Sequence, residues 1–130
     1  MRNPAPTILL VEDDNDLRHQ FRRALVFAGY RTQDAEDGFH ACDVLDTHPP
    51  DLVVLDLPLP VASGHVILQE VVSQAHTRQI PVVVVIDLRG EYGDFGDDCV
   101  LRKPVSPDEL VLAVRRCLAS NRGPERLQKP

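Results

Sequence analysis

The sequence predicts one α/β domain built on a parallel β-sheet with helices on both faces. Two observations carry this prediction. Three short apolar runs rich in β-branched residues are spaced along the chain, and segments of helical periodicity lie between them. Continuous apolar runs, as opposed to alternating ones, are typical of central strands covered on both faces. Alternation of strand and helix then implies parallel strands joined by right-handed crossovers.

The expected strands are the apolar runs themselves. Residues 7–11, 51–56 and 80–86 are rich in Val, Leu and Ile and are predicted to be central strands. Residues 30–33 carry a weaker signal and are expected to form a less central strand. A short strand is expected over residues 99–102.

Two helices are expected in the first half of the chain. Between residues 17 and 28 the apolar side chains recur on one face, as in an amphipathic helix. Asp14 or Asn15 is the expected cap of its first turn, and Gly29 suits the position just beyond its end. A shorter helix is expected over residues 38–47, because two prolines follow it and a helix cannot continue through them.

The second half of the chain predicts two further helices, over residues 64–75 and 107–119. Ser106 is the expected N-cap of the last helix, and Pro107 suits its first position. The segment 87–98 (DLRGEYGDFGDD) stands where another helix would complete the alternation, but it contains three glycines. Because each interior glycine costs a helix about 1 kcal/mol, we expect a loop or one irregular turn there.

Length and composition agree with a single soluble domain. The chain has 130 residues, 43% of them hydrophobic and 26% charged, and its formal net charge is −6. These values argue against a disordered chain, and the acidic balance predicts neither nucleic acid nor a membrane as a direct partner. Three cysteines are too few for a disulfide framework, so a reducing cytoplasm is the expected location. No apolar run is long enough to span a membrane.

Charged residues follow three of the expected strands. Glu12 and Asp13 come after the first strand, Asp56 ends the third, and Lys103 follows the last. In an open parallel sheet, ligands bind outside the carboxyl ends of the strands, so these side chains are expected to meet at one edge. Carboxylates this close repel each other unless a cation lies among them. Oxygen ligands of this kind suit Mg²⁺.

These residues carry a family resemblance. The chain resembles the receiver domain of bacterial two-component response regulators over about residues 5–120. The matching segments are 8–14 (ILLVEDD), 56–60 (DLPLP) with Gly64 after it, and 101–104 (LRKP). The resemblance implies a flavodoxin-like, doubly wound sheet of five parallel strands in the order 2-1-3-4-5. It also implies a receiver domain over residues 1–120, with 121–130 as a tail or linker.

The resemblance implies a role for each matching residue. Asp56 is expected to be the phosphoacceptor, and Lys103 the cation that pairs first with Asp56 and then with the phosphoryl group. Asp13 is expected to bind Mg²⁺ directly, Glu12 mainly through a water molecule, and Pro58 through its backbone carbonyl. The bond between Lys103 and the next residue, a proline, is expected to be cis.

The implied function is signal transduction. A histidine kinase or a histidine phosphotransfer protein would donate a phosphoryl group to Asp56 in a Mg²⁺-dependent reaction. The domain would catalyse its own phosphorylation and dephosphorylation without turning over a substrate, and would act on an output domain or a partner protein.

Three features depart from the family pattern. Receivers usually carry Thr or Ser at the end of the fourth strand, where this chain has Ile86, or Asp87 if the alignment slips by one residue. They usually carry an aromatic residue where this chain has Val100, and their fourth helix is longer than the segment 87–98 allows. We therefore expect phosphorylation to be coupled to the output of the domain in an atypical way. The alternative is an interaction module that keeps the receiver fold but does not depend on phosphorylation.

The acidic segment has three other interpretations. Asp14 is expected to cap the first helix, since acids favour helix N-termini. The run Asp14-Asn15-Asp16 resembles the DxD motif of aspartate-nucleophile phosphatases, but Arg18 stands where that motif requires Thr or Val. An EF-hand loop is less favoured still, because Arg18 also occupies the position of its required glycine.

Overall fold

The computed structural model of the chain describes residues 4–56, 62–86 and 99–121. Every strand and helix expected within these ranges is present, with ends within about two residues of the prediction. The elements in chain order are β1 (Thr7–Val11), α1 (Asn15–Phe27), β2 (Arg31–Ala35), α2 (Gly38–Thr47), β3 (Leu52–Asp56), α3 (Ala62–Thr77), β4 (Val82–Ile86), β5 (Cys99–Arg102) and α4 (Pro107–Asn121).

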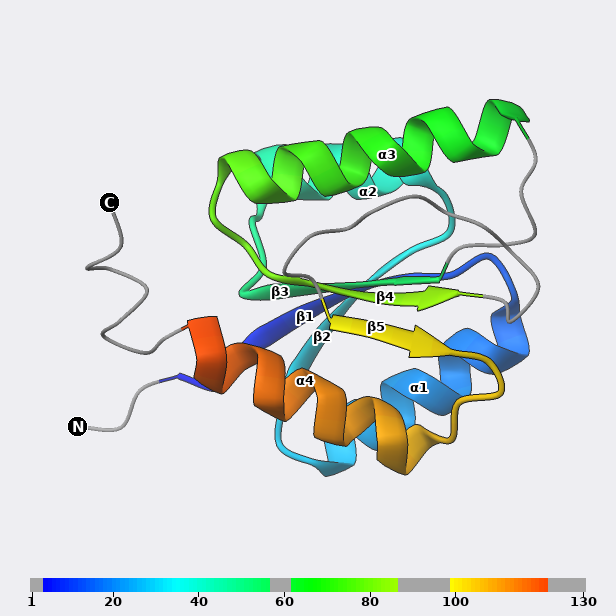
Figure 1. Ribbon diagram of the computed structural model, residues 1–130. Helices are drawn as coiled ribbons and strands as arrows, with labels where there is room; N and C mark the ends of the chain where they lie inside the picture. The colour runs from blue at the N-terminus through cyan, green and yellow to red at the C-terminus, as the bar shows by residue number, and fades with distance from the viewer. Residues whose placement is uncertain (1–3, 57–61, 87–98, 122–130) are drawn as a thin grey trace.

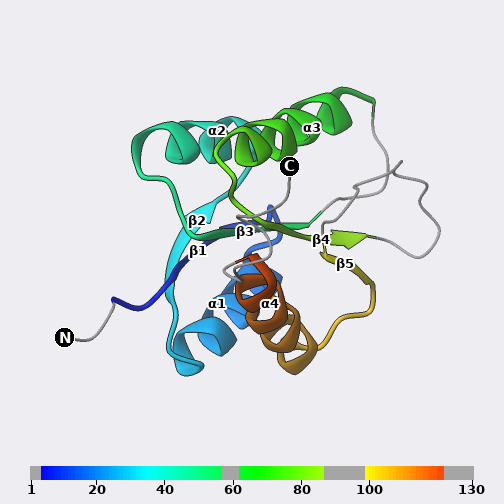
Figure 2. The same ribbon diagram turned by 60° about the vertical axis from the view of Figure 1, so that its left-hand side comes forward.

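The strands form one parallel sheet in the order β2-β1-β3-β4-β5, which confirms the predicted fold class. Helices α2 and α3 cover one face, and α1 and α4 cover the other (Figures 1 and 2). The chain order reverses between β1 and β3, because β1 pairs with both β2 and β3. The carboxyl ends of β1 and β3 therefore lie at the switch point of the sheet, where ligands bind in folds of this kind.

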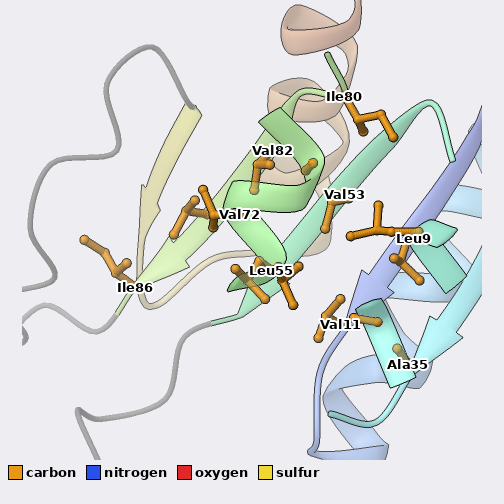
Figure 3. Close-up of a cluster of buried hydrophobic side chains, with 14 residues drawn as sticks. Leu9, Val11, Ala35, Val53, Leu55, Val72, Ile80, Val82 and Ile86 are labelled. Carbon is orange, nitrogen blue, oxygen red and sulfur yellow. The ribbon is translucent and has the colours of Figure 1, made fainter. Parts of the chain in front are cut away.

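Alternate residues of each central strand enter two separate cores. Leu9 and Val11 of β1 pack toward α2 and α3, in the cluster that Figure 3 shows. Ile8 and Leu10 pack on the other face, with Phe21 of α1. All these side chains are buried, and burying each one stabilises the fold by about 1.5–3 kcal/mol. The two cores fix the rotation of β1 about its own axis. They therefore also fix the direction in which Glu12 leaves the end of the strand.

The ends of the helices agree with the expected caps. Asp14 caps α1, since its Oδ1 accepts hydrogen bonds from the backbone of Asp16 at 2.9 Å and of Leu17 at 3.1 Å. Gly29 follows α1 with φ of 100°, a left-handed conformation that favours glycine. Ser106 and Glu109 exchange backbone–side-chain hydrogen bonds of 3.1 Å at the start of α4. This reciprocal pair is a capping box.

Some predictions fall on residues that the structure does not describe. The segment 87–98, where we expect a loop or irregular turn in place of the usual helix between β4 and β5, lies outside the described residues. Pro58 also lies outside them. The expected tail over 121–130 also lies outside them, apart from Asn121 at the end of α4. Within the described ranges, none of the helices has the length and apolar character needed to cross a membrane.

Candidate functional site

The candidate site is built from the ends of three strands. Asp56 is the last residue of β3, Glu12 follows β1, and Lys103 follows β5. Backbone hydrogen bonds continue the ladders past the strand ends: Glu12 N–H donates to the Ala35 carbonyl at 3.1 Å, and Lys103 N–H donates to the Ile86 carbonyl at 2.8 Å. The backbones of Glu12 and Lys103 are thus held by the sheet, and their position does not depend on a free loop.

Lys103 and Asp56 form an ion pair at this edge of the sheet. The Nζ atom of Lys103 lies 2.6 Å from Oδ1 of Asp56, whose side chain is 2% exposed. The lysine side chain is one-third exposed, so it reaches the carboxylate from the solvent side. The peptide bond between Lys103 and Pro104 is cis, as predicted. The buried carboxylate of Asp56, paired with the Lys103 ammonium group, is the central feature of the site.

Glu12 is the second buried acid of the site. Its Oε2 accepts a hydrogen bond from the backbone of Asp14 at 3.0 Å, while Oε1 is buried without a hydrogen-bond partner among the described residues. Burial raises the pKa of Glu12 to about 9, and the nearby Asp56 carboxylate adds to the increase. At neutral pH without a cation, Glu12 therefore holds a proton.

The other two predicted Mg²⁺ ligands are Asp13 and Pro58. Asp13 is exposed and lies close enough to Glu12 to help raise the pKa of that carboxyl group. Pro58 is not among the described residues. Within residues 4–56, 62–86 and 99–121, no three His, Cys, Asp or Glu side chains are arranged to hold a metal ion. The structure thus brings Glu12 and Asp56 together with Lys103, and leaves Asp13 at the rim.

The buried acids still have the chemistry that a hard cation requires. Oε1 of Glu12 and Oδ2 of Asp56 are both buried without a hydrogen-bond partner in the described part of the chain. Buried carboxylate oxygens that lack donors are destabilised unless a cation compensates them. Mg²⁺ typically takes one or two carboxylates and completes its shell with water or phosphate oxygens. Glu12 and Asp56 therefore fit such an ion, with Asp13 placed to join them.

The end of β4 differs from the rest of the site because it is apolar. Ile86 is 4% exposed, and its side chain belongs to the core cluster under α2 and α3 (Figure 3). Its backbone carbonyl accepts the hydrogen bond from Lys103 described above. On the neighbouring strand β5, Val100 is 42% exposed. Ile86 thus holds the strand end through backbone and core contacts and brings no side-chain donor to Asp56.

Sequence reasoning missed one residue beside the site, Arg18 of α1. Its side chain is buried, and its Nη1 donates a hydrogen bond of 2.7 Å to the backbone carbonyl of Glu12. Nη2 donates to Oδ1 of Asn15, and Nε lies 3.7 Å from Oδ2 of Asp34 on β2. A signal was available, since Arg18 stands three residues before the buried Phe21 and so shares the buried face of the helix.

Comparisons with known proteins agree with this geometry. The family model described as response regulator receiver domain matches residues 8–115. The response regulator MprA of Mycobacterium sp. (strain KMS) is 34% identical over 124 residues, which cover 91% of this chain and 54% of that protein. The chain therefore spans about half the length of this curated relative.

Solved structures of receiver domains are also similar to this chain. The signal receiver domain of a putative Luxo repressor protein from Vibrio parahaemolyticus has a TM-score of 0.73 and 25% identity, and the match covers 97% of this chain and 98% of that one. The signal receiver domain of a signal transduction histidine kinase from Syntrophus aciditrophicus has a TM-score of 0.75 and 27% identity, with 89% and 92% covered. Both are similar to this chain over nearly their whole length.

Proposed function

This chain belongs to the response regulator receiver domain family of two-component signalling, and we propose that it accepts a phosphoryl group on Asp56. Domains of this family are signalling domains, as opposed to enzymes that turn over a substrate. The observation that carries the proposal is the ion pair of 2.6 Å between Lys103 and the buried Asp56, with a second buried acid, Glu12, beside it.

The proposed reaction is nucleophilic attack by a carboxylate oxygen of Asp56 on the phosphorus atom of a phosphohistidine. The new O–P bond forms as the P–N bond of the donor breaks, and the imidazole leaves with the electron pair of that bond. Positioning and charge neutralisation supply most of the catalysis in phosphoryl transfer. Lys103 supplies a fixed positive charge next to the attacking group, and it can follow the phosphoryl oxygens once Asp56 is phosphorylated.

The chain would hold Mg²⁺ through Asp13, Asp56 and, by way of water, Glu12, with the carbonyl of Pro58 as a further ligand. The ion, when bound, supplies positive charge to the phosphoryl oxygens and offsets the repulsion among the acids. The product is an aspartyl phosphate, which the domain would also help water to hydrolyse. The phosphoryl group adds negative charge and acceptor oxygens that can bias a two-state surface.

The cytoplasm is the proposed location of this chain, and a histidine kinase or a histidine phosphotransfer protein is the proposed donor. An output domain or a partner protein would receive the signal. Output coupling is proposed to be atypical. Either Ile86, which is buried and apolar, or Asp87 stands where the family usually has a hydroxyl group that binds the phosphoryl oxygen, and neither residue carries that group. The chain would therefore keep the phosphorylation chemistry while communicating it to its surface by another route.

The test is phosphorylation by a small donor. The chain is incubated with phosphoramidate or acetyl phosphate and Mg²⁺, and its intact mass is measured. We expect a mass increase of one phosphate that is absent in Asp56→Asn and abolished by EDTA. A chain that gains no phosphate from any donor, including a phosphorylated histidine phosphotransfer protein, would instead be a phosphorylation-independent interaction module. Multiple turnover of a phosphomonoester would indicate a phosphatase.

A further inference from the structure

We propose that Arg18 is a positioning residue for the acidic site, which holds the Glu12–Asp13 backbone in the geometry that Mg²⁺ binding requires. This inference rests on the proposed function, because it assigns a role in the same site. Arg18 lies on the buried face of α1 and contacts the backbone of Glu12, not its carboxylate. Its effect is therefore transmitted through the backbone of Glu12.

The burial of Arg18 calls for an explanation. The residue is 8% exposed, although a guanidinium group is unfavourable in a protein interior unless it is paired and hydrogen-bonded. Each part of its planar group has a partner. Nη1 donates to the carbonyl of Glu12 at 2.7 Å, Nη2 donates to Asn15, and Nε lies 3.7 Å from Asp34. One side chain thus joins the turn after β1, the first turn of α1 and strand β2.

These contacts fix Glu12 from both sides of its backbone. Its N–H is held by the carbonyl of Ala35 on β2 at 3.1 Å, and its carbonyl is held by Arg18 at 2.7 Å. The carbonyl of Glu12 belongs to the same planar peptide unit as the N–H of Asp13. Fixing that plane therefore orients the Glu12 side chain toward Asp56 and sets the point from which the Asp13 side chain leaves the backbone.

A neighbouring arginine provides the matched control. Arg22, one turn further along α1, has its Nη1 3.1 Å from the same Oδ2 of Asp34, and its other hydrogen bond is to His19. Replacing Arg22 removes a positive charge and a contact with Asp34, as replacing Arg18 does. Only the Arg18 replacement also removes the hydrogen bond to the Glu12 carbonyl.

The experiment measures the dissociation constant for Mg²⁺ by isothermal titration calorimetry in the full chain and in Arg18→Met, Arg18→Lys and Arg22→Met. We expect Arg18→Met to weaken Mg²⁺ binding by about tenfold, in the range typical of groups that orient metal ligands. Arg18→Lys keeps the charge but loses the planar fork, so it should also bind more weakly. Arg22→Met should stay within about twofold of the unmodified chain.

A kinetic readout separates positioning from stability. Initial rates of phosphorylation by phosphoramidate are measured against Mg²⁺ concentration. We expect Arg18→Met to raise the Mg²⁺ concentration for half-maximal rate by about tenfold, with the rate at saturating Mg²⁺ nearly unchanged. A residue with only a structural role would lower the melting temperature without moving the half-saturating concentration.

Each outcome decides the proposal. If Arg18→Met folds and binds Mg²⁺ as tightly as the unmodified chain, the positioning role is overturned while the proposed function stands. If Arg22→Met weakens Mg²⁺ binding as much as Arg18→Met does, the effect belongs to Asp34 and the proposal is again overturned. An unmodified chain that binds no Mg²⁺ and accepts no phosphoryl group overturns the proposed function as well. Should Arg18→Met not fold, Arg18→Lys and Asn15→Ala test the same contacts, and unchanged binding in both overturns the role.

Discussion

Oδ1 of Asp56 lies 2.6 Å from Nζ of Lys103, although these residues end different strands and are separated in the sheet by β4. The pair forms because both strands stop at the same edge and because the backbone N–H of Lys103 is bonded to Ile86 at the end of β4. The carboxylate is buried and the ammonium group partly exposed. In the proposed reaction, the incoming phosphoryl group would therefore interact with Lys103 in place of the Asp56 oxygen.

Replacing Lys103 by Met should slow phosphorylation of Asp56 by about a hundredfold, because the fixed positive charge that meets the phosphoryl oxygens is lost. The measurement is the initial rate of mass increase with phosphoramidate at saturating Mg²⁺. Arg102→Met, which removes an exposed charge one residue earlier, is the matched control and should leave the rate nearly unchanged. An equal rate in Lys103→Met and the unmodified chain would contradict the role of this lysine.

Asp56→Asn should raise the melting temperature of the metal-free chain at pH 8. The reason is that the Asp56 carboxylate raises the pKa of Glu12, so at pH 8 the folded chain holds a proton that the unfolded chain has released, and the amide lessens that cost. Lys103, which loses its ion pair with Asp56, is partly exposed and can be solvated. Thermal unfolding in EDTA followed by circular dichroism makes the comparison. A melting temperature lowered by the substitution would show that the ion pair between Asp56 and Lys103 outweighs the effect of Asp56 on Glu12.

The sequence was sufficient for the strands because their signal is local. Val82 to Ile86 and Leu52 to Leu55 are continuous β-branched or aliphatic runs, and both lie in buried strands. The caps were equally local, since Asp14 and Ser106 bond to residues two or three positions away. The convergence of Glu12, Asp56 and Lys103 followed from the rule that parallel strands end at one edge.

The spacing to Phe21 could place Arg18 on the buried face of α1, but the partners of Arg18 could not be found in this way because they are set by tertiary structure. A charged residue on a helix is usually solvated, and only the pairing of β1 with β2 brings Asp34 beside α1. The position of the Glu12 backbone has the same cause, since it is held by Ala35 on β2 and by Arg18 on α1.

Ile86→Thr should destabilise the chain by about 2 kcal/mol more than Ile86→Val. Ile86 is buried in the core under α2 and α3, and a hydroxyl group without a partner is unfavourable there. Thr and Val have nearly the same shape, so their difference isolates the hydroxyl group. Urea unfolding at pH 7 measures both free energies. Equal stability of the two variants would indicate that residue 86 can direct a hydroxyl group toward Asp56.

Without a metal, the chain should lose stability as pH rises from about 4.5 to about 9. In the folded chain the pKa of Glu12 is raised to about 9 from a usual value of 4.5, chiefly by burial. Across this window the folded state keeps a proton that the unfolded state has released, so raising the pH favours unfolding. Below pH 4.5 both states hold the proton, and the contribution no longer changes. The amide in Glu12→Gln cannot ionise. This variant should therefore show a weaker pH dependence of stability between about pH 4.5 and about pH 9.

The measurement is the free energy of unfolding in urea at pH 6, 7 and 8, with EDTA and then with Mg²⁺. Because Mg²⁺ favours the ionised acids, adding it should stabilise the unmodified chain more at pH 8 than at pH 6. Glu12→Gln should show a smaller pH dependence of that stabilisation, since one of the ionising groups is gone. A pH profile in EDTA that is the same for Glu12→Gln and the unmodified chain would mean that Glu12 is already ionised in the folded state at neutral pH.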